Sequence, residues 1–363
     1  MATSSRSAAP GRSAIPSGNR LGFLDFIRGV AAFAVVLQHG GETFWPAINR
    51  ATHNYLNVGR FGVVAFFLVS GFIIPFSLER SGSVRRFWTG RFFRLYPLYW
   101  ASLAAILVIY QFRDVALTSD FQQHTVAYSL VNITMIQELI GIPHAIGLYY
   151  TLTVEIVFYA ACAVLFALGL LSNSVRNAWV VVGGAFVLGT VAPLVLDHRA
   201  PMAGFFYVSS MFFGTVVYRY SVGVARLVDV QRLLVAITVF GLIGCYVNYV
   251  HFTDLNDGDP FTFWGATIGW SLAYVFFFAA FAARDRQFPS PFLWLGRISY
   301  SLYLMHPLVL AIVMPWSNRP AACAVLVVAS LLLANATYHG IEVPFQKLGR
   351  SIAARDTAPL RAH

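Results

Sequence analysis

The sequence predicts an all-α integral membrane protein, a bundle of about ten transmembrane helices with both ends of the chain in the cytoplasm. The first observation behind this prediction is composition, because hydrophobic residues make up 58% of the 363 residues and charged residues 11%. A soluble domain carries about 25% charged residues. The other two observations are a series of long apolar segments and an uneven distribution of arginines between them.

The apolar segments follow one another along the whole chain. A bilayer core of about 30 Å needs about 20 mostly apolar residues in each crossing helix. The candidates are 23–41, 59–78, 95–112, 125–141, 148–171, 178–196, 202–218, 232–251, 262–283, 292–314 and 321–341. Segment 125–141 is the weakest, because Asn, Gln and Glu lie inside it.

The basic residues favour ten spans over eleven. In membrane proteins Lys and Arg gather in the cytoplasmic loops. If 125–141 does not cross and the N-terminus is cytoplasmic, 19 basic residues lie inside and five outside. If 125–141 crosses, the division becomes 10 inside and 14 outside. We therefore expect ten spans, with 125–141 as a re-entrant or interfacial piece, and keep eleven spans as the alternative.

The chain is expected to form one membrane domain between two tails. Residues 1–20 are rich in Ser, Ala, Pro and Gly and predict a disordered cytoplasmic tail. Residues 21–348 would form the membrane domain and 349–363 a second cytoplasmic tail. The net charge of +10 does not indicate nucleic-acid binding, since the basic residues lie in short loops between apolar segments.

The cysteines indicate no special chemistry. All three lie inside apolar segments, with a spacing that suits neither a metal site nor a disulfide framework. We expect no metal, and interpret them as small buried hydrophobic residues: Cys162, Cys245 and Cys323.

Ionisable residues inside the first span are the leading candidates for function. Intramembrane charges are costly and face a bundle interior or a water-filled cavity. Arg28 and His39 are eleven residues apart, so on a helix they point the same way, about 16 Å apart along the axis. Asp25 shares that face. The alternative is an Arg28 that extends to the interface and a hydrogen-bonded interfacial His39.

Two further segments carry charges that need an explanation. Arg91 and Arg94 lie on one helical face, and guanidinium groups bind phosphate oxygens bidentately. A cytoplasmic anchor with an aromatic belt is the alternative. Glu155 is an unpaired carboxylate inside an apolar segment, and beside a histidine it would orient the ring or raise its basicity. A structural ion pair or the proton site of a transporter are its alternatives.

The last two spans add a polar face and an acid. Ser299, Tyr303 and His306 are spaced i, i+4 and i+7, on one face of a helix. A packed histidine is the alternative for His306. Glu342 falls at the end of the last span, where an ordinary exposed interfacial acid is expected.

Six motifs in fixed order carry a resemblance to a known family. They are "LDFIRGVAAFAVVLQH", "FFLVSGFIIPFSL", "RFFRLYPLYW", "YTLTVEIVFY", "ISYSLYLMHPLV" and "IEVPF". Over residues 21–348 the sequence resembles the membrane-bound acyltransferase-3 family, integral-membrane O-acyltransferases that act on bacterial glycans and some small molecules.

The resemblance implies roles for particular residues. The family's arginine–ten residues–histidine motif matches Arg28 and His39, and its paired arginines match Arg91 and Arg94. Its acidic residue matches Glu155. These matches imply acyl-CoA binding by the three arginines.

One departure from the family pattern lies just before that acid. Tyr150 stands where the family usually has Trp, and Thr151 and Thr153 stand at two positions that are usually Ser. These changes keep the polarity but bear on acceptor preference. We count Tyr150 among the candidate pocket residues, with Asp25, Ser299, Tyr303 and His306.

The resemblance also implies a reaction. An acyl group, usually acetyl, would pass from cytoplasmic acyl-CoA, a co-substrate and not a bound cofactor, to an acceptor hydroxyl. His39 would act as general base with Glu155 as its partner, or form an acyl-histidine intermediate.

The acceptor and the location follow from the same resemblance. An envelope glycan or exopolysaccharide is the expected acceptor, with a macrolide-like small molecule as alternative. The expected location is the cytoplasmic (inner) membrane, with polysaccharide-assembly proteins as candidate partners. The rival classes are a proton-coupled transporter or flippase and a scaffold of polysaccharide assembly. Many transporters contain internal repeats, and none is visible in this sequence, which argues against a transporter.

Overall fold

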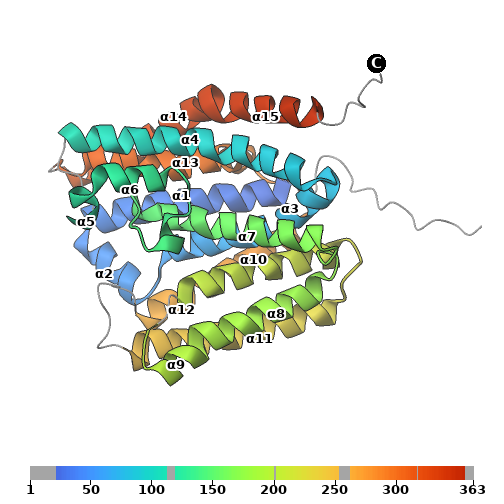
Figure 1. Cartoon of the computed structure of the whole chain (residues 1–363). Helices are drawn as coiled ribbons and strands as arrows, with labels where there is room; N and C mark the ends of the chain where they lie inside the picture. The colour runs from blue at the N-terminus through green and yellow to red at the C-terminus, as the bar shows by residue number, and fades with distance from the viewer. Residues whose placement is uncertain (1–21, 113–118, 200–201, 253–261, 317, 356–363) are drawn as a thin grey trace, which may run out of the picture.

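The computed structural model describes residues 22–112, 119–199, 202–252, 262–316 and 318–355. Within these ranges every regular element is a helix, which confirms the all-α prediction (Figure 1). The predicted tail over residues 1–20 lies outside the described residues.

The bundle is built from long helices that run roughly alongside one another (Figure 1). They are α1 Gly22–Phe44, α3 Val58–Ser81, α4 Val84–Phe112, α7 Tyr150–Ala167, α8 Ser174–Phe186, α10 Met202–Ser221, α11 Leu227–Tyr246, α12 Phe263–Ala282, α13 Ser290–Val313 and α14 Arg319–Thr337. Three of them continue through a π-helical turn. Helix α8 continues through Val187–Val191 into α9 Ala192–Leu196, and α11 continues through Val247–His251. Helix α14 continues through Tyr338–Glu342 into α15 Val343–Arg355.

The helices correspond to the ten segments that we expected to cross. Nine helical segments of the described residues are long and apolar enough for this. The tenth, α10, has 20 residues, most of them buried, and packs against α3 and α8. The chain is thus a multi-pass membrane protein, and the side on which its ends lie stays a prediction.

Segment 125–141 does not form a spanning helix. It contains α6 Thr125–Asn132, of eight residues, and a 3₁₀ turn Gln137–Ile140. Eight residues extend only about 12 Å along a helix, far short of a bilayer core of about 30 Å. The chain is completed by α2 Pro46–Asn54, α5 Ser119–Gln123 and a 3₁₀ turn Gly147–Tyr149.

The outside of the bundle is suited to lipid. Large apolar side chains are exposed on several of the peripheral helices, and they include Val180, Val195, Val235, Val328 and Leu332. In a bilayer such side chains contact acyl chains rather than water. The core, by contrast, centres on α1, which packs against α3 and α13, and on α3, which also packs against α10 and α12.

Glycine allows the closest of these approaches. Gly71 on α3 lies against the backbone of Met211 on α10, where a Cβ atom would overlap backbone atoms. Small residues let membrane helices approach closely, which is a main source of their packing energy.

We expect Gly71→Val to lower the apparent melting temperature in detergent by about 5 °C or more, because overpacking costs about 1–3 kcal/mol. Gly204→Val on α10 is the matched control, since a Cβ there has no neighbour within 4 Å. A thermal melt followed by size-exclusion chromatography measures both. Equal melting temperatures for the two variants would contradict this packing.

Helix α15 extends the last span and packs beside α4 (Figure 1). It continues to Arg355, so residues 349–355 of the predicted second tail are helical, and 356–363 lie outside the described residues. The π-helical turn before α15 carries Glu342, which is 3% exposed. The expectation of an exposed acid there is wrong, because the helix continues past this point and stays against its neighbours.

Candidate active site

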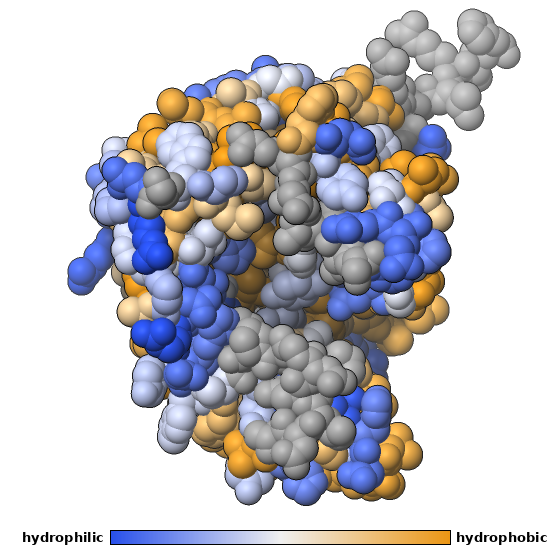
Figure 2. Space-filling view, turned by 90° about the vertical axis from the view of Figure 1, so that its left-hand side faces the viewer, coloured by the Kyte–Doolittle hydropathy of each residue, from blue (hydrophilic) through white to orange (hydrophobic). Residues whose placement is uncertain are grey.

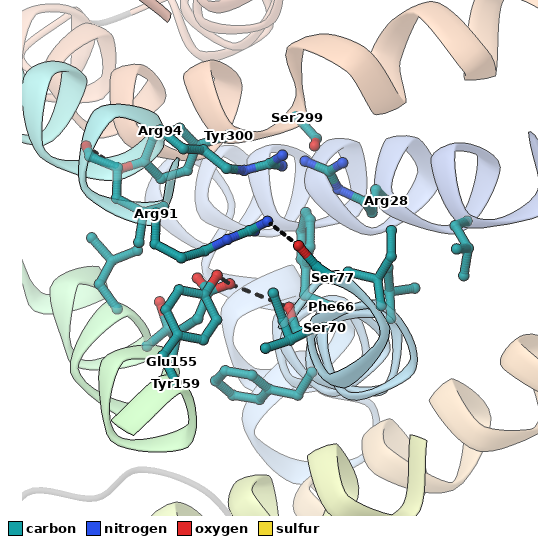
Figure 3. A pocket seen from close by; sticks show the side chains of 18 of the residues that line it. Arg28, Phe66, Ser70, Ser77, Arg91, Arg94, Glu155, Tyr159, Ser299 and Tyr300 are labelled. Atoms are coloured by element: carbon teal, nitrogen blue, oxygen red, sulfur yellow. Dashed lines mark hydrogen bonds between the residues drawn. The ribbon is translucent and has the colours of Figure 1, made fainter. Parts of the chain in front are cut away.

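A cavity of about 360 Å³ lies between α1, α3, α4, α7 and α13 (Figure 3). Its walls combine apolar side chains of α3, such as Val63, Phe66 and Ile73, with a set of polar ones. Seven of the ten residues that the sequence nominated line it: Asp25, Arg28, Arg91, Arg94, Glu155, Ser299 and Tyr303. The other three, His39, Tyr150 and His306, do not line it.

Arg28 and Arg94 bring two positive charges together in this cavity. Figure 3 shows their guanidinium groups pointing toward each other from α1 and α4, close to Ser299. Arg28 forms an ion pair with Asp25, with 3.8 Å between Nη1 and Oδ1, and its side chain is 18% exposed. Two guanidinium groups in such proximity repel each other, so an anion between them would be stabilised by both.

Arg91 is held by its neighbours in a fixed orientation. Its Nη2 donates a hydrogen bond to Ser77 Oγ at 3.0 Å (Figure 3). Its guanidinium lies 5.5 Å from the centroid of the Phe87 ring and 5.7 Å from that of Tyr159. Its Nε is buried and has no hydrogen-bond partner among the described residues. A buried N–H donor without a partner is suited to donate a hydrogen bond to an oxygen atom of a ligand.

Glu155 belongs to the arginine-lined part of the molecule. It accepts hydrogen bonds from the hydroxyl of Tyr159, one turn further along α7, and from Ser70 Oγ at 3.4 Å. It also lies within the electrostatic reach of Arg28 and Arg94. The carboxylate thus offsets part of the positive charge of the cavity.

The expected pair of Glu155 and His39 is not formed. Glu155 lines the same cavity as Arg28, whereas His39 lies about 16 Å further along α1 than Arg28. The reason is the depth of Glu155 in the bundle. It lies more than one helical turn after the start of α7, and this places it at the level of Arg28.

His39 contacts another histidine instead. Its Nδ1 lies 3.1 Å from Nε2 of His306, and the two ring centroids are 5.2 Å apart. Nδ1 of His306 lies 3.0 Å from the carbonyl oxygen of Leu302. His306 is fully buried, and His39 is partly exposed.

Tyr303 connects the histidine pair to the cavity. It lines the cavity, and its ring centroid lies 6.1 Å from that of His306, one helical turn further along α13. Its hydroxyl shares a 2.9 Å hydrogen bond with Thr151 Oγ1. The histidine pair therefore lies just beyond the end of the cavity that Tyr303 and Thr151 form.

Tyr150 lies beside the cavity and not in it. Its ring stacks on Tyr207 of α10, with centroids 6.2 Å apart and planes inclined by 26°. The position that departs from the family pattern therefore supports an aromatic pair between α7 and α10.

The structure adds polar cavity residues that the sequence did not nominate. These are Ser70, Ser77, Arg80, Tyr159 and Tyr300. Two signals were available in the sequence: Ser70 and Ser77 are seven residues apart on α3, and Tyr159 is four residues after Glu155, so each pair shares a helix face.

Glu342 lies near the cavity, although it does not line it. Ser301 Oγ donates a hydrogen bond to it at 2.9 Å and Gln346 Nε2 another at 3.0 Å. It also interacts electrostatically with Arg94 and Arg28. A buried carboxylate of this kind needs such partners, and it helps to hold the arginines in place.

The helices and the cavity define a multi-pass membrane protein with an internal polar site. The profile of the acyltransferase domain family matches residues 21–339. The chain therefore belongs to the membrane-bound acyltransferase-3 family.

One relative is also similar over part of its length. Acyltransferase MdmB from Streptomyces mycarofaciens is 35% identical over 83 residues, which is 22% of this chain and 21% of the relative. The match thus spans about a fifth of that protein. No solved structure matches the chain.

Proposed function

We propose that the protein transfers an acetyl group from acetyl-CoA to a hydroxyl of an envelope glycan or exopolysaccharide, with His39 as general base. One observation carries the proposal, namely that Arg28, Arg91 and Arg94 line one cavity together. Three guanidinium groups in one small cavity suit a ligand with several phosphate groups, as coenzyme A has.

The remaining walls suit the rest of the donor. Arg80 is exposed and also lines the cavity, so it marks the part nearest to solvent. The predicted topology makes this end cytoplasmic, which is where coenzyme A is made. Apolar side chains of α3 would cover the pantetheine arm, which is long enough to carry a thioester past Tyr303 toward the histidine pair.

The acceptor would come from the opposite end of the bundle. Figure 2 looks onto the end where α2 lies, and the surface there is hollowed near its centre with hydrophilic side chains on both sides. Helix α1 ends on this side and carries His39 near that end. An acceptor that enters here would reach His39 without passing the arginines.

The proposed chemistry needs one base. Neutral His39 takes the proton of the acceptor hydroxyl as its oxygen attacks the thioester carbonyl. The new oxygen–carbon bond forms, the carbon–sulfur bond breaks, and the proton passes on to the coenzyme A thiolate. Positioned general bases typically contribute about 10²–10⁴-fold to such a rate.

We expect the protein in lipid nanodiscs to release free thiol from acetyl-CoA only when an acceptor is added. The acceptors to compare are an envelope glycan extract, a purified exopolysaccharide and a polyhydroxylated macrolactone, each with [¹⁴C]acetyl-CoA. Labelled glycan supports the proposal, and labelled macrolactone alone would replace its acceptor.

A transport assay tests the rival hypothesis that the protein is a proton-coupled transporter. In sealed vesicles without acetyl-CoA, accumulation of labelled acceptor that depends on a proton gradient would identify transport. Such accumulation, with no thiol release for any acceptor, would overturn the proposal.

A further inference from the structure

The contact between His39 and His306 determines where the protons of both rings lie. The chain of contacts has three members: the carbonyl oxygen of Leu302, the ring of His306 and the ring of His39. Leu302 and His306 are both on α13, four residues apart, and His39 comes from α1. Each ring nitrogen of His306 thus has a partner.

The carbonyl of Leu302 fixes the first proton. A carbonyl oxygen only accepts hydrogen bonds, so Nδ1 of His306, 3.0 Å away, must carry a proton. In a neutral imidazole the other nitrogen then has a lone pair. The reverse arrangement would set two lone pairs against each other inside a fully buried site, which is costly.

The second proton follows from the first. Nε2 of His306 accepts, so Nδ1 of His39, 3.1 Å away, must donate. The lone pair of His39 is therefore on Nε2, on the other side of its ring. Neither ring has a carboxylate among the contacts of the described residues, which favours neutral forms of both.

We infer that His306 is a positioning residue that holds His39 in the tautomer with the proton on Nδ1, so that Nε2 is the basic atom. The inference deepens the proposed function and rests on its assignment of His39 as base. A free neutral histidine in water prefers the proton on Nε2, which would leave no lone pair on the side away from His306.

The surrounding packing keeps this geometry. Helices α1 and α13 pack closely, and Gly29 of α1 lies against the backbone of Phe292 and Gly296. Leu302 is itself fully buried one turn before His306. The acceptor oxygen that orients His306 is thus part of a helix, and backbone carbonyls often orient metal-bound histidines by accepting a hydrogen bond from the ring N–H in the same way.

Histidine NMR tests the inference without any need for turnover. The full-length protein in nanodiscs is labelled with ¹⁵N-histidine, and the signal that disappears in His39→Gln is assigned to His39. We expect its Nδ1 to be protonated and its Nε2 to carry the lone pair. In His306→Phe, which keeps the ring volume, we expect the proton of His39 to move to Nε2. A His39 protonated on Nε2 in the unmodified protein would overturn the inference.

Kinetics provide the second readout. We expect His306→Phe to lower kcat at least about tenfold with KM for acetyl-CoA unchanged. His306→Gln retains an oxygen that accepts from His39 Nδ1, so its kcat should lie between those of His306→Phe and the unmodified protein. Equal kcat for the two variants would contradict a tautomer effect and leave only packing.

The two proposals fail in different ways. If the unmodified protein shows the predicted tautomer but transfers no acetyl group to any acceptor, the proposed function fails and the positioning stands. If it transfers acetyl while His39 carries its proton on Nε2, the positioning role fails alone. A His306→Phe variant that does not fold leaves the tautomer of the unmodified protein and His306→Gln to decide.

Discussion

His39→Gln is expected to lower kcat for acetyl transfer by about 10²–10⁴-fold, because the amide of glutamine cannot take the proton of the acceptor hydroxyl. The side chain stays large enough to fill the space beside His306, and it keeps hydrogen-bonding capacity toward it. We therefore expect KM for acetyl-CoA to stay within about twofold, since the arginines that bind the donor are untouched. The measurement is initial-rate thiol release in nanodiscs with saturating acceptor.

The matched control for this variant is His339→Gln, at an exposed position in the π-helical turn before α15. It makes the same chemical change far along the chain from both histidines of the pair. We expect unchanged kcat for it. A loss of less than about tenfold in His39→Gln would remove His39 from the role of base.

The second large effect is expected on donor binding. Arg91→Gln should raise the Kd for coenzyme A by about tenfold to a hundredfold, since a hydrogen bond to a charged group contributes about 1.5–3 kcal/mol. Arg91 is held in place by Ser77 and by two aromatic rings, so little entropy is lost when it binds a phosphate. Equilibrium binding of coenzyme A to the purified protein measures the change.

Two further variants make this test specific. Arg91→Lys keeps the charge but not the fork of donors, and we expect it to restore only part of the affinity. Arg176→Gln removes an exposed arginine on α8, outside the cavity, and should leave the Kd unchanged. Equal losses for Arg91→Gln and Arg176→Gln would mean that overall charge and not the cavity binds the donor.

The sequence correctly predicted features that depend on the geometry of a single helix, such as which residues share one of its faces. Arg28 and Asp25, and likewise Arg91 and Arg94, were expected on one face because helix geometry fixes their spacing. The cost of burying charge in a membrane then required these faces to turn inward. All four line the cavity, although their roles stay predictions.

Relations between helices were harder to predict. The depth of Glu155 in the bundle depends on where α7 begins relative to α1, and no local pattern gives that value. The pairing of His39 with His306 depends on the contact of α1 with α13, which are far apart in sequence. Ser70 and Ser77 share a face of α3, but their spacing alone does not show that this face borders the cavity, because that depends on how α3 packs against its neighbours.

Two segments near the membrane surface differ in the same way, since one was predicted from the sequence and the other was not. The distribution of arginines favoured a 125–141 segment that does not cross, and the short helix α6 agrees with this. The burial of Glu342 was not predicted, because the continuation of α14 into α15 extends a helix past the point where its apolar residues end. Continuity of a helix through a π-helical turn is set by tertiary packing as much as by local sequence.

The most direct test of the account is a cryo-electron microscopy map of the full chain in nanodiscs with coenzyme A. We expect density for its phosphate groups against Arg28, Arg91 and Arg94, with the pantetheine arm running between α3 and α13 toward Tyr303. Coenzyme A bound elsewhere in the bundle, with this cavity filled only by solvent or lipid, would contradict the central claim that the arginine-lined cavity holds the acyl donor.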